Sequence, residues 1–248
     1  MKKYELMKET KVIGGKTLFR IRALRSFGGI KAGDLGGFIE NERNLSHEGN
    51  AWVGDNAKVG GNAKVSDNAR VGGNARVGGN AKVSDNARVG GNAKVSDNAR
   101  VGGYARVGGN ARVDGDARVG GYAWVGGNAR VGGYAWVEDD ARVDGDAWVV
   151  SNAQVGGDAW VGGNARVGGD GLINSDNDYL CEKGLGSHNR SASFFKCKDG
   201  HIHVLCGCFD GNLDEFENKV KEEHGNSKYA KEYLGFIEVV KTHFEVCQ

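Results

Sequence analysis

The residues best suited to metal or redox chemistry lie near the C-terminal end of the chain. All the cysteines are found there, at positions 181, 197, 206, 208 and 247. Thiolates and imidazoles are the usual ligands of zinc, and they are close in sequence at Cys197, His201, His203, Cys206 and Cys208. The chain has no Cys-x-x-Cys pair, however, and an odd number of cysteines without a secretory signal indicates reduced thiols. We therefore expect free thiols and no metal, with zinc as the alternative.

A second group of polar residues suggests anion binding. The run Gly186-Ser-His-Asn-Arg190 would place the hydroxyl of Ser187, the imidazole of His188 and the guanidinium of Arg190 around one anion. A surface turn uses the same residue types. Both interpretations stay open at the level of the sequence.

Histidine titrates near neutral pH and is therefore the usual general base. No histidine lies between His47 and His188, and His47 by itself is better explained as a surface or capping residue. The sequence thus predicts no catalytic residue in the central part of the chain.

That central part is a strict repeat. Residues 51–170 form twenty hexads of the general form Ala-x-Val-(Gly/Ser/Asp)-(Gly/Asp)-(Asn/Asp/Tyr), without insertion or deletion. A period of six does not match the 3.6-residue period of a helix. In a short strand, Ala and Val would face one side and the residue between them would face outward. The following Gly-Gly or Ser-Asp pair would turn the chain. Three hexads would close a triangular coil of 18 residues, which gives about 6.7 coils stacked roughly 4.8 Å apart.

The repeated unit Val-Gly-Gly-Asn-Ala-Arg resembles the motif of the hexapeptide-repeat proteins, over about half of the chain. The resemblance implies a mainly β fold, the left-handed parallel β-helix, and the handedness follows from the resemblance alone. Many members are acyltransferases with a catalytic histidine and a projecting loop, and others resemble gamma-class carbonic anhydrases with three histidine zinc ligands. The repeats here contain neither histidine nor loop insertion, and they lack the outward Thr columns of the ice-binding type. We therefore expect a protein that is not an enzyme and needs no cofactor.

Residues 18 apart would stack in columns on the surface of the prism. The outward position is Lys or Arg in fourteen hexads, Trp in five and Gln in one. Exposed aromatic residues gathered in one region are typical of an interface. The predicted interface residues are Trp124, Trp136, Trp148, Trp160, Tyr122, Tyr134 and Arg142. Arg142 is expected to stack between Trp124 and Trp160 through cation–π contacts. The first candidate is a homotrimer, which prisms of this family commonly form; solvated columns without a partner are the alternative.

Composition excludes several classes of protein. The chain has 248 residues, with 33 basic and 32 acidic side chains and a formal net charge of +1, which argues against a nucleic-acid coat or a polybasic membrane binder. The charge is nevertheless divided along the chain. Residues 51–112 carry a net charge of +6 and residues 113–170 a net charge of −5. No apolar run is long enough to span a membrane, and the N-terminus has no secretory signal, so we expect a cytoplasmic protein.

The two ends differ from the repeat, as capping segments of a solenoid must. Residues 1–50 are expected to form an N-terminal β cap, with a hairpin around Gly14-Gly15 and a strand within 33–40. Residues 51–170 would form the β-helix. In residues 171–248, strands at 191–196 and 201–206 and helices at 213–224 and from Asn226 to about Phe244 predict a C-terminal ββαα module.

Both ends are also similar to phage- and prophage-encoded hexapeptide β-helix proteins. The similar segments are residues 18–24, 33–40 and 44–46 at one end, and 206–211, 213–216 and 223–226 at the other. The resemblance implies a phage or prophage origin. Together with the missing histidines and the exposed aromatic residues, this origin leads us to expect a non-catalytic binding protein in the host cytoplasm, whose partner is a host protein such as a component of a defence system. A small anionic, nucleotide-like ligand held between protomers by Arg190 and solenoid arginines is the alternative. An acyltransferase-like enzyme is a weaker one.

Overall fold

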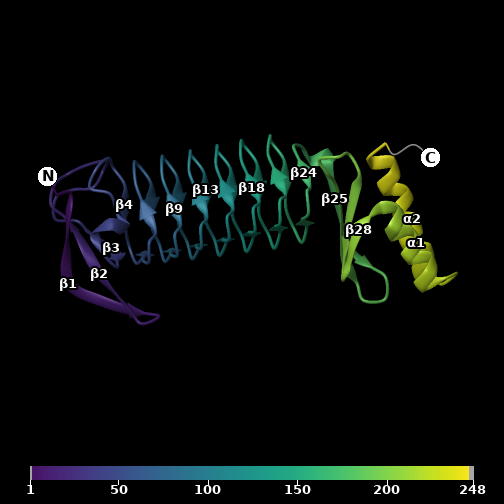
Figure 1. Cartoon of the computed structure of the whole chain (residues 1–248), viewed down its shortest axis with the longest axis horizontal. Helices are drawn as coiled ribbons and strands as arrows, with labels where there is room; N and C mark the ends of the chain where they lie inside the picture. Colours follow the sequence, from purple (N-terminus) through teal and green to yellow (C-terminus); the bar gives the residue numbers. More distant parts are fainter. Residues whose placement is uncertain (1, 246–248) are drawn as a thin grey trace.

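The structure is a computed structural model that describes residues 2–245 of the chain. The molecule is elongated, with its two termini at opposite ends (Figure 1). A β-hairpin stands at the N-terminal end, a column of short strands runs along the middle, and a sheet with two helices closes the C-terminal end. The fold is mainly β, a parallel β-solenoid, as the repeat predicts.

Each hexad of the solenoid forms a strand of two residues, made of the outward residue and the valine, and one further strand, β24, follows the last hexad. The strands are β4 (Trp52–Val53), β5 (Lys58–Val59), β6 (Lys64–Val65), β7 (Arg70–Val71), β8 (Arg76–Val77), β9 (Lys82–Val83), β10 (Arg88–Val89), β11 (Lys94–Val95), β12 (Arg100–Val101), β13 (Arg106–Val107), β14 (Arg112–Val113), β15 (Arg118–Val119), β16 (Trp124–Val125), β17 (Arg130–Val131), β18 (Trp136–Val137), β19 (Arg142–Val143), β20 (Trp148–Val149), β21 (Gln154–Val155), β22 (Trp160–Val161), β23 (Arg166–Val167) and β24 (Leu172–Ile173). Each strand from β4 to β21 pairs in parallel with the strand three further along the chain, so three sheets form the three faces of a prism.

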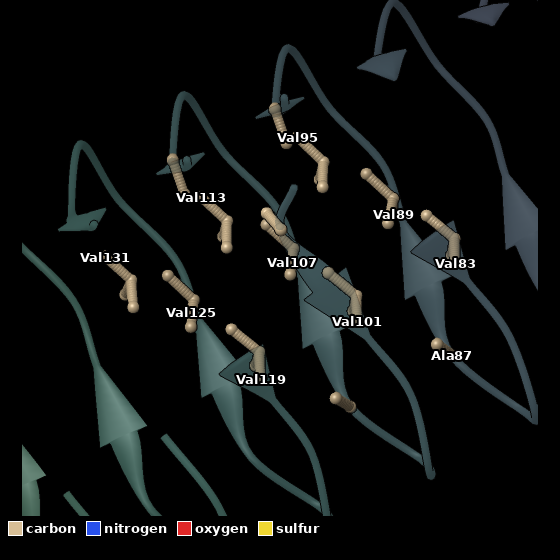
Figure 2. Packing of buried hydrophobic residues seen from close by; sticks show 14 of the residues in the cluster. Val83, Ala87, Val89, Val95, Val101, Val107, Val113, Val119, Val125 and Val131 are labelled. Carbon is tan, nitrogen blue, oxygen red and sulfur yellow. The ribbon is translucent and has the colours of Figure 1, made fainter. Parts of the chain in front are cut away.

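The alanines at the first position and the valines at the third position of the hexads fill the inside of this prism. All of them are buried, and the valines of successive coils stand above one another, as Val89, Val107 and Val125 do in Figure 2. Burial of one valine side chain contributes about 1.5–3 kcal/mol relative to exposure. The interior is therefore a continuous dry core that a single coil could not make alone.

The corners of the prism need backbone angles that most residues avoid. The fifth residue of the hexad has a positive φ, as at Gly61 (66°) and Asp67 (58°). Glycine or aspartate occupies this place in every hexad but one, which has Ser151, because both tolerate the left-handed region. Asparagines next to the corners form hydrogen-bonded ladders between coils; in one of them Asn92 donates to Asn110, and Asn110 donates to Asn128.

The N-terminal cap consists of β1 (Tyr4–Ile13), β2 (Lys16–Ala23), β3 (Leu35–Ile39) and a 3-10 turn, η1 (Glu42–Asn44). The predicted hairpin at Gly14-Gly15 joins β1 to β2. Strand β3 pairs antiparallel with β2 but parallel with β5, so it begins the stacking. With β3 at the start, one face holds eight parallel strands, and β24 lies beyond residue 170. The solenoid therefore has about eight turns and is longer than the predicted 6.7 coils.

Polar side chains of the cap form hydrogen bonds with backbone groups of the first coil and of the cap itself. The amide of Asn44 is buried and donates to the carbonyl oxygens of Gly61 and Ala63. His47 stacks on Tyr4 with ring centroids 4.3 Å apart and accepts a hydrogen bond from the backbone of Lys3. His47 thus has the capping role that the sequence predicts.

Trp52 departs from its predicted exposure. It occupies the outward position of its hexad but is only 5% exposed. Phe27 of the cap packs against the indole edge-on, with ring centroids 5.6 Å apart. The prediction was wrong because the cap folds back over the first face of the prism.

The C-terminal module contains two more strands than predicted. After a 3-10 turn, η2 (Asp176–Asp178), the strands β25 (Tyr179–Leu185), β26 (Arg190–Lys196), β27 (Ile202–Cys206) and β28 (Phe209–Asn212) form an antiparallel meander. Strands β26 and β27 and both helices, α1 (Leu213–His224) and α2 (Lys228–His243), confirm the prediction. Helix α2 is capped by Ser227, whose side chain accepts from the Ala230 amide, and not by Asn226.

The module's sheet lies between the last coil and the helices (Figure 1). Successive residues in and just after β26 pack on opposite sides of the sheet. Phe195 and Cys197 pack with the solenoid core, whereas Phe194 packs with the core between sheet and helices. Within residues 2–245, neither helix has the length and apolar character needed to cross a membrane.

Candidate functional site

The predicted aromatic interface residues are distributed over all three faces of the prism. Trp124, Arg142 and Trp160 share the face that β16, β19 and β22 form. Trp136 lies in β18 on the second face and Trp148 in β20 on the third. The full predicted set therefore cannot contact one flat partner at the same time.

Part of the set meets in one hollow of about 620 Å³, which we call the aromatic–arginine groove. It is lined by Asn86, Arg88, Tyr104, Arg106, Tyr122, Trp124, Asp140 and Arg142. These residues come from two columns, the outward residues of one face and the residues of the adjoining corner. Because both columns repeat every 18 residues, the groove follows the axis of the prism over four successive coils.

The aromatic wall of the groove is preformed. The rings of Tyr104 and Tyr122 are stacked, with centroids 4.9 Å apart and planes 7° from parallel. This spacing matches the distance between neighbouring coils, about 4.8 Å, so the backbone itself sets the stack. Tyr122 is 64% exposed and Trp124 is 40% exposed, which leaves both available to a partner.

The column of outward residues in the groove is mainly basic. The lining includes three arginines, Arg88, Arg106 and Arg142, and one carboxylate, that of Asp140, so it has an excess of positive charge. Guanidinium groups bind carboxylates and phosphates in a bidentate manner, and aromatic rings stack on planar groups. The groove is therefore suited to a partner that carries acidic and aromatic or apolar groups.

The cation–π stack is found at another place than predicted. Trp148 lies between two arginines, with the guanidinium carbons of Arg130 and Arg166 at 4.7 and 5.2 Å from its ring. Among the described residues, no such contact joins Arg142 to Trp124 or Trp160. The indole of Trp160 instead donates to Asp144, at 3.0 Å.

The predicted anion-binding residues are not all gathered in one place. Ser187 and His188 form an exposed hydrogen-bonded pair, with 2.9 Å between Oγ and Nδ1. The side chain of Arg190 lies against Gly207 and lines a separate hollow of about 350 Å³. Its other lining residues are Asp146, Trp148, Asn164, Arg166, Ser191 and Gly207. Arg190 thus meets a solenoid arginine, as the alternative function requires, but Ser187 and His188 do not line this hollow.

Three of the five zinc-ligand candidates come together beside the last coil. The ligand atoms of Cys197, His201 and His203 all lie within 4.8 Å of one another. Cys206 packs on the helix side of the sheet and Cys208 is exposed; Cys247 lies outside the described residues. Burial, with the charges of Asp199 and Asp170, raises the pKa of the Cys197 thiol to about 11.

Sequence reasoning did not single out the carboxylates beside these histidines. Asp199 Oδ1 is 2.5 Å from His201 Nδ1, and Asp210 Oδ1 is 2.6 Å from His203 Nε2. The pair Asp199-Gly200 just before His201 is typical of a turn and could have indicated the first contact. Nothing in the sequence indicated the second, because Asp210 belongs to β28, a strand that the sequence did not predict.

Comparison with known proteins supports the fold. A family model described as the YdcK beta-solenoid repeat matches residues 105–121, about one coil. No curated protein matches the chain.

Proposed function

We propose that this chain is a phage- or prophage-encoded binding protein that acts without catalysis. It works as a homotrimer and presents the aromatic–arginine groove to a host protein, whose activity in a defence system it would inhibit. The similarity of both ends to phage and prophage β-helix proteins supports the origin, and the family's habit of packing three prisms together supports the trimer.

The observation that carries the proposal is the exposed pair Tyr122 and Trp124 beside Arg106 and Arg142. Tyrosine, tryptophan and arginine are the residue types that most often dominate binding at protein interfaces. Because their backbone is locked in the parallel coils, little ordering entropy is lost when a partner binds. A groove along several coils fits an extended acidic segment of a protein better than a compact ligand.

The chain offers a closely matched pair of variants for the test. The sequence Gly-Gly-Tyr-Ala-Trp-Val occurs at residues 120–125 and again at 132–137, on two different faces. We compare the double variant Tyr122→Ala/Trp124→Ala with the control Tyr134→Ala/Trp136→Ala. Both remove the same side chains from the same positions of a hexad, and the control also removes the cation–π contact of Trp136 with Arg118.

The measurement is native mass spectrometry of each protein after expression in its host, with identification of proteins bound in stoichiometric amounts. The wild type and the control should form trimers that carry the host partner, and Tyr122→Ala/Trp124→Ala should lose that partner. A monomeric wild type would contradict the trimer. Equal retention by both double variants would contradict the groove as the binding site.

A second function is favoured by one observation, the meeting of Arg190 and Arg166 beside Trp148. Two guanidinium groups and an indole could hold a phosphate and a planar base, which is the chemistry of a nucleotide. In that case the native mass would include an additional component of nucleotide size. Arg190→Ala should remove it, and Arg118→Ala, on another face, should not.

A further inference from the structure

The cluster of Cys197, His201 and His203 has a geometry that the proposed function does not use. Cys197 follows the end of β26, His201 immediately precedes β27, and His203 lies within β27 opposite Phe195. A turn with Gly200 joins them, and the backbone amide of Cys197 donates to the carbonyl oxygen of His201. The hairpin therefore holds the thiol and both imidazoles on the side of the sheet that faces the solenoid.

Both imidazole rings are fixed by carboxylates on their outer side. Asp199 binds Nδ1 of His201, and Asp210 binds Nε2 of His203. An ionised carboxylate only accepts hydrogen bonds, so each of these ring nitrogens carries the proton. In the neutral form of each ring, the remaining nitrogen has a free lone pair and lies on the side of the other histidine. This carboxylate–histidine arrangement is the usual outer shell of a histidine-bound metal.

The two inner nitrogens face each other. His201 Nε2 and His203 Nδ1 are 3.4 Å apart. Two lone pairs at this distance repel unless a proton or a cation lies between them. Nitrogen ligands at about 2.0–2.1 Å from a tetrahedral zinc ion lie about 3.3–3.4 Å from each other, so the observed separation fits a shared metal.

The surroundings favour a cation as well. The cluster opens into a hollow of about 690 Å³ between the last coil and the module. Asp170, Asp199 and Glu215 line it, against one basic residue, Lys198. Asp210 adds a further negative charge behind His203.

We propose that Cys197, His201 and His203 bind one zinc ion, with Asp199 and Asp210 as the outer shell. Three protein ligands leave the fourth position of a tetrahedral site open toward the hollow, where water or a small anion would bind. The ion would also join β27 to the last coil, because Cys197 packs in the solenoid core and its backbone bridges to Gly171. This inference stands apart from the proposed function, since the groove and the zinc site share no residue.

The test uses the full-length protein without a histidine tag. Zinc content is measured by mass spectrometry after dialysis against equimolar zinc, and affinity by competition with a chromogenic chelator. We expect one zinc per chain, bound with a Kd below about 1 µM. With Co²⁺ in place of zinc, the absorption spectrum should show tetrahedral d–d bands and a thiolate charge-transfer band. Less than one tenth of an equivalent of zinc would overturn the proposal.

Variants separate the metal from a proton shared by the two histidines. Cys197→Ser should abolish the charge-transfer band and weaken zinc binding more than about 100-fold, and the matched control Cys208→Ser should change neither. Asp210→Asn changes an exposed residue and leaves folding intact, yet it should weaken zinc binding about 10–100-fold. If Cys197→Ser and Asp210→Asn bind zinc as the wild type does, the assigned ligands are wrong.

Discussion

The backbone of Gly127 lies so close to Gly109 in the preceding coil that a β-carbon on Gly109 would be 2.6 Å from the Gly127 carbonyl oxygen. Gly109 also has a φ of 60°, in the left-handed region. Its neighbour Gly108 has no atom within 4 Å of the corresponding position and a φ outside that region. The two glycines of one corner therefore differ in their need to be glycine.

We expect Gly109→Ala to lower the free energy of unfolding by at least about 1–2 kcal/mol, because a β-carbon is disfavoured at positive φ and would collide with the next coil. Gly108→Ala should leave it unchanged or raise it by about 0.4–1 kcal/mol, since alanine restricts the unfolded chain. Urea unfolding followed by circular dichroism measures both. Equal effects of the two substitutions would show that the corner has no such asymmetry.

Trp148 and Trp124 should differ in what they do for stability. Trp148 lies between Arg130 and Arg166, so Trp148→Leu should lower the free energy of unfolding by about 0.5–2 kcal/mol through lost cation–π contacts. Trp124 has no such contact among the described residues, and Trp124→Leu should stay within about 0.5 kcal/mol of the wild type. Thermal and urea unfolding of the two variants provide the comparison. A larger loss for Trp124→Leu would mean that the groove stabilises the fold.

Lys3 should make the free energy of unfolding depend on pH in the alkaline range. The residue is buried, and its Nζ donates to the carbonyl oxygens of Ala51 and Glu48. Burial, with the nearby charges of Arg25 and Arg70, lowers the pKa of Lys3 to about 8. Between pH 8 and the usual lysine pKa of about 10.4, the unfolded chain binds more protons than the folded one. The contribution of Lys3 to the unfolding free energy should therefore rise with pH, by up to about 1.4 kcal/mol per unit.

The variant Lys3→Met isolates this effect, because it cannot titrate at position 3 while every other group is kept. The stability of the wild type relative to Lys3→Met should be constant below pH 7 and increase between pH 8 and 10. A difference that stays flat over this range would mean that Lys3 keeps an ordinary pKa.

Asp178 should make the stability of the fold depend on pH in the acidic range. Burial by itself would raise the pKa of its carboxyl group, but hydrogen bonds from the Asn174 amide, Lys196 and Ser175 outweigh burial and lower the pKa. A lowered pKa stabilises the fold above the usual value of about 3.9, and that stabilisation is lost as the pH falls through the folded-state pKa. At pH 7, Asp178→Asn should cost about 1–3 kcal/mol.

The difference between the wild type and Asp178→Asn should shrink as the pH falls below about 4. Asp158→Asn, at an exposed corner, is the control and should have little effect at any pH. If Asp158→Asn lowered stability as much as Asp178→Asn, the junction between η2 and the module would not depend on the Asp178 carboxylate.

The solenoid could be predicted in detail because one local rule is repeated twenty times. A valine two residues after an alanine, followed by a corner that tolerates positive φ, determines strand, turn and stacking together. The columns of outward residues followed directly from the 18-residue coil. Trp52 is buried although the rule predicts its exposure, because its burial depends on Phe27 in another part of the chain.

The C-terminal module was harder to predict because its strands depend on pairing. Strand β28 reads Phe-Asp-Gly-Asn, a composition typical of turns, and it is a strand only because it pairs with β27. The contacts within the candidate sites differ in the same way: those set by the repeat could be predicted, and those set by strand pairing could not. The stack of Tyr104 on Tyr122 follows from the repeat, whereas Asp210 reaches His203 only through the sheet.

The uninterrupted hexads also fix how the two ends of the molecule are oriented relative to each other. Three hexads complete one coil, so the removal of 18 residues would shorten the protein by about 4.8 Å and leave both ends at the same rotation about the axis. Removal of six residues would instead rotate the C-terminal module by a third of a turn relative to the N-terminal hairpin. The number of whole coils therefore sets the distance between the two ends, and the number of hexads sets their relative rotation about the axis. Two binding surfaces at opposite ends could be spaced by whole coils without any change in their relative direction.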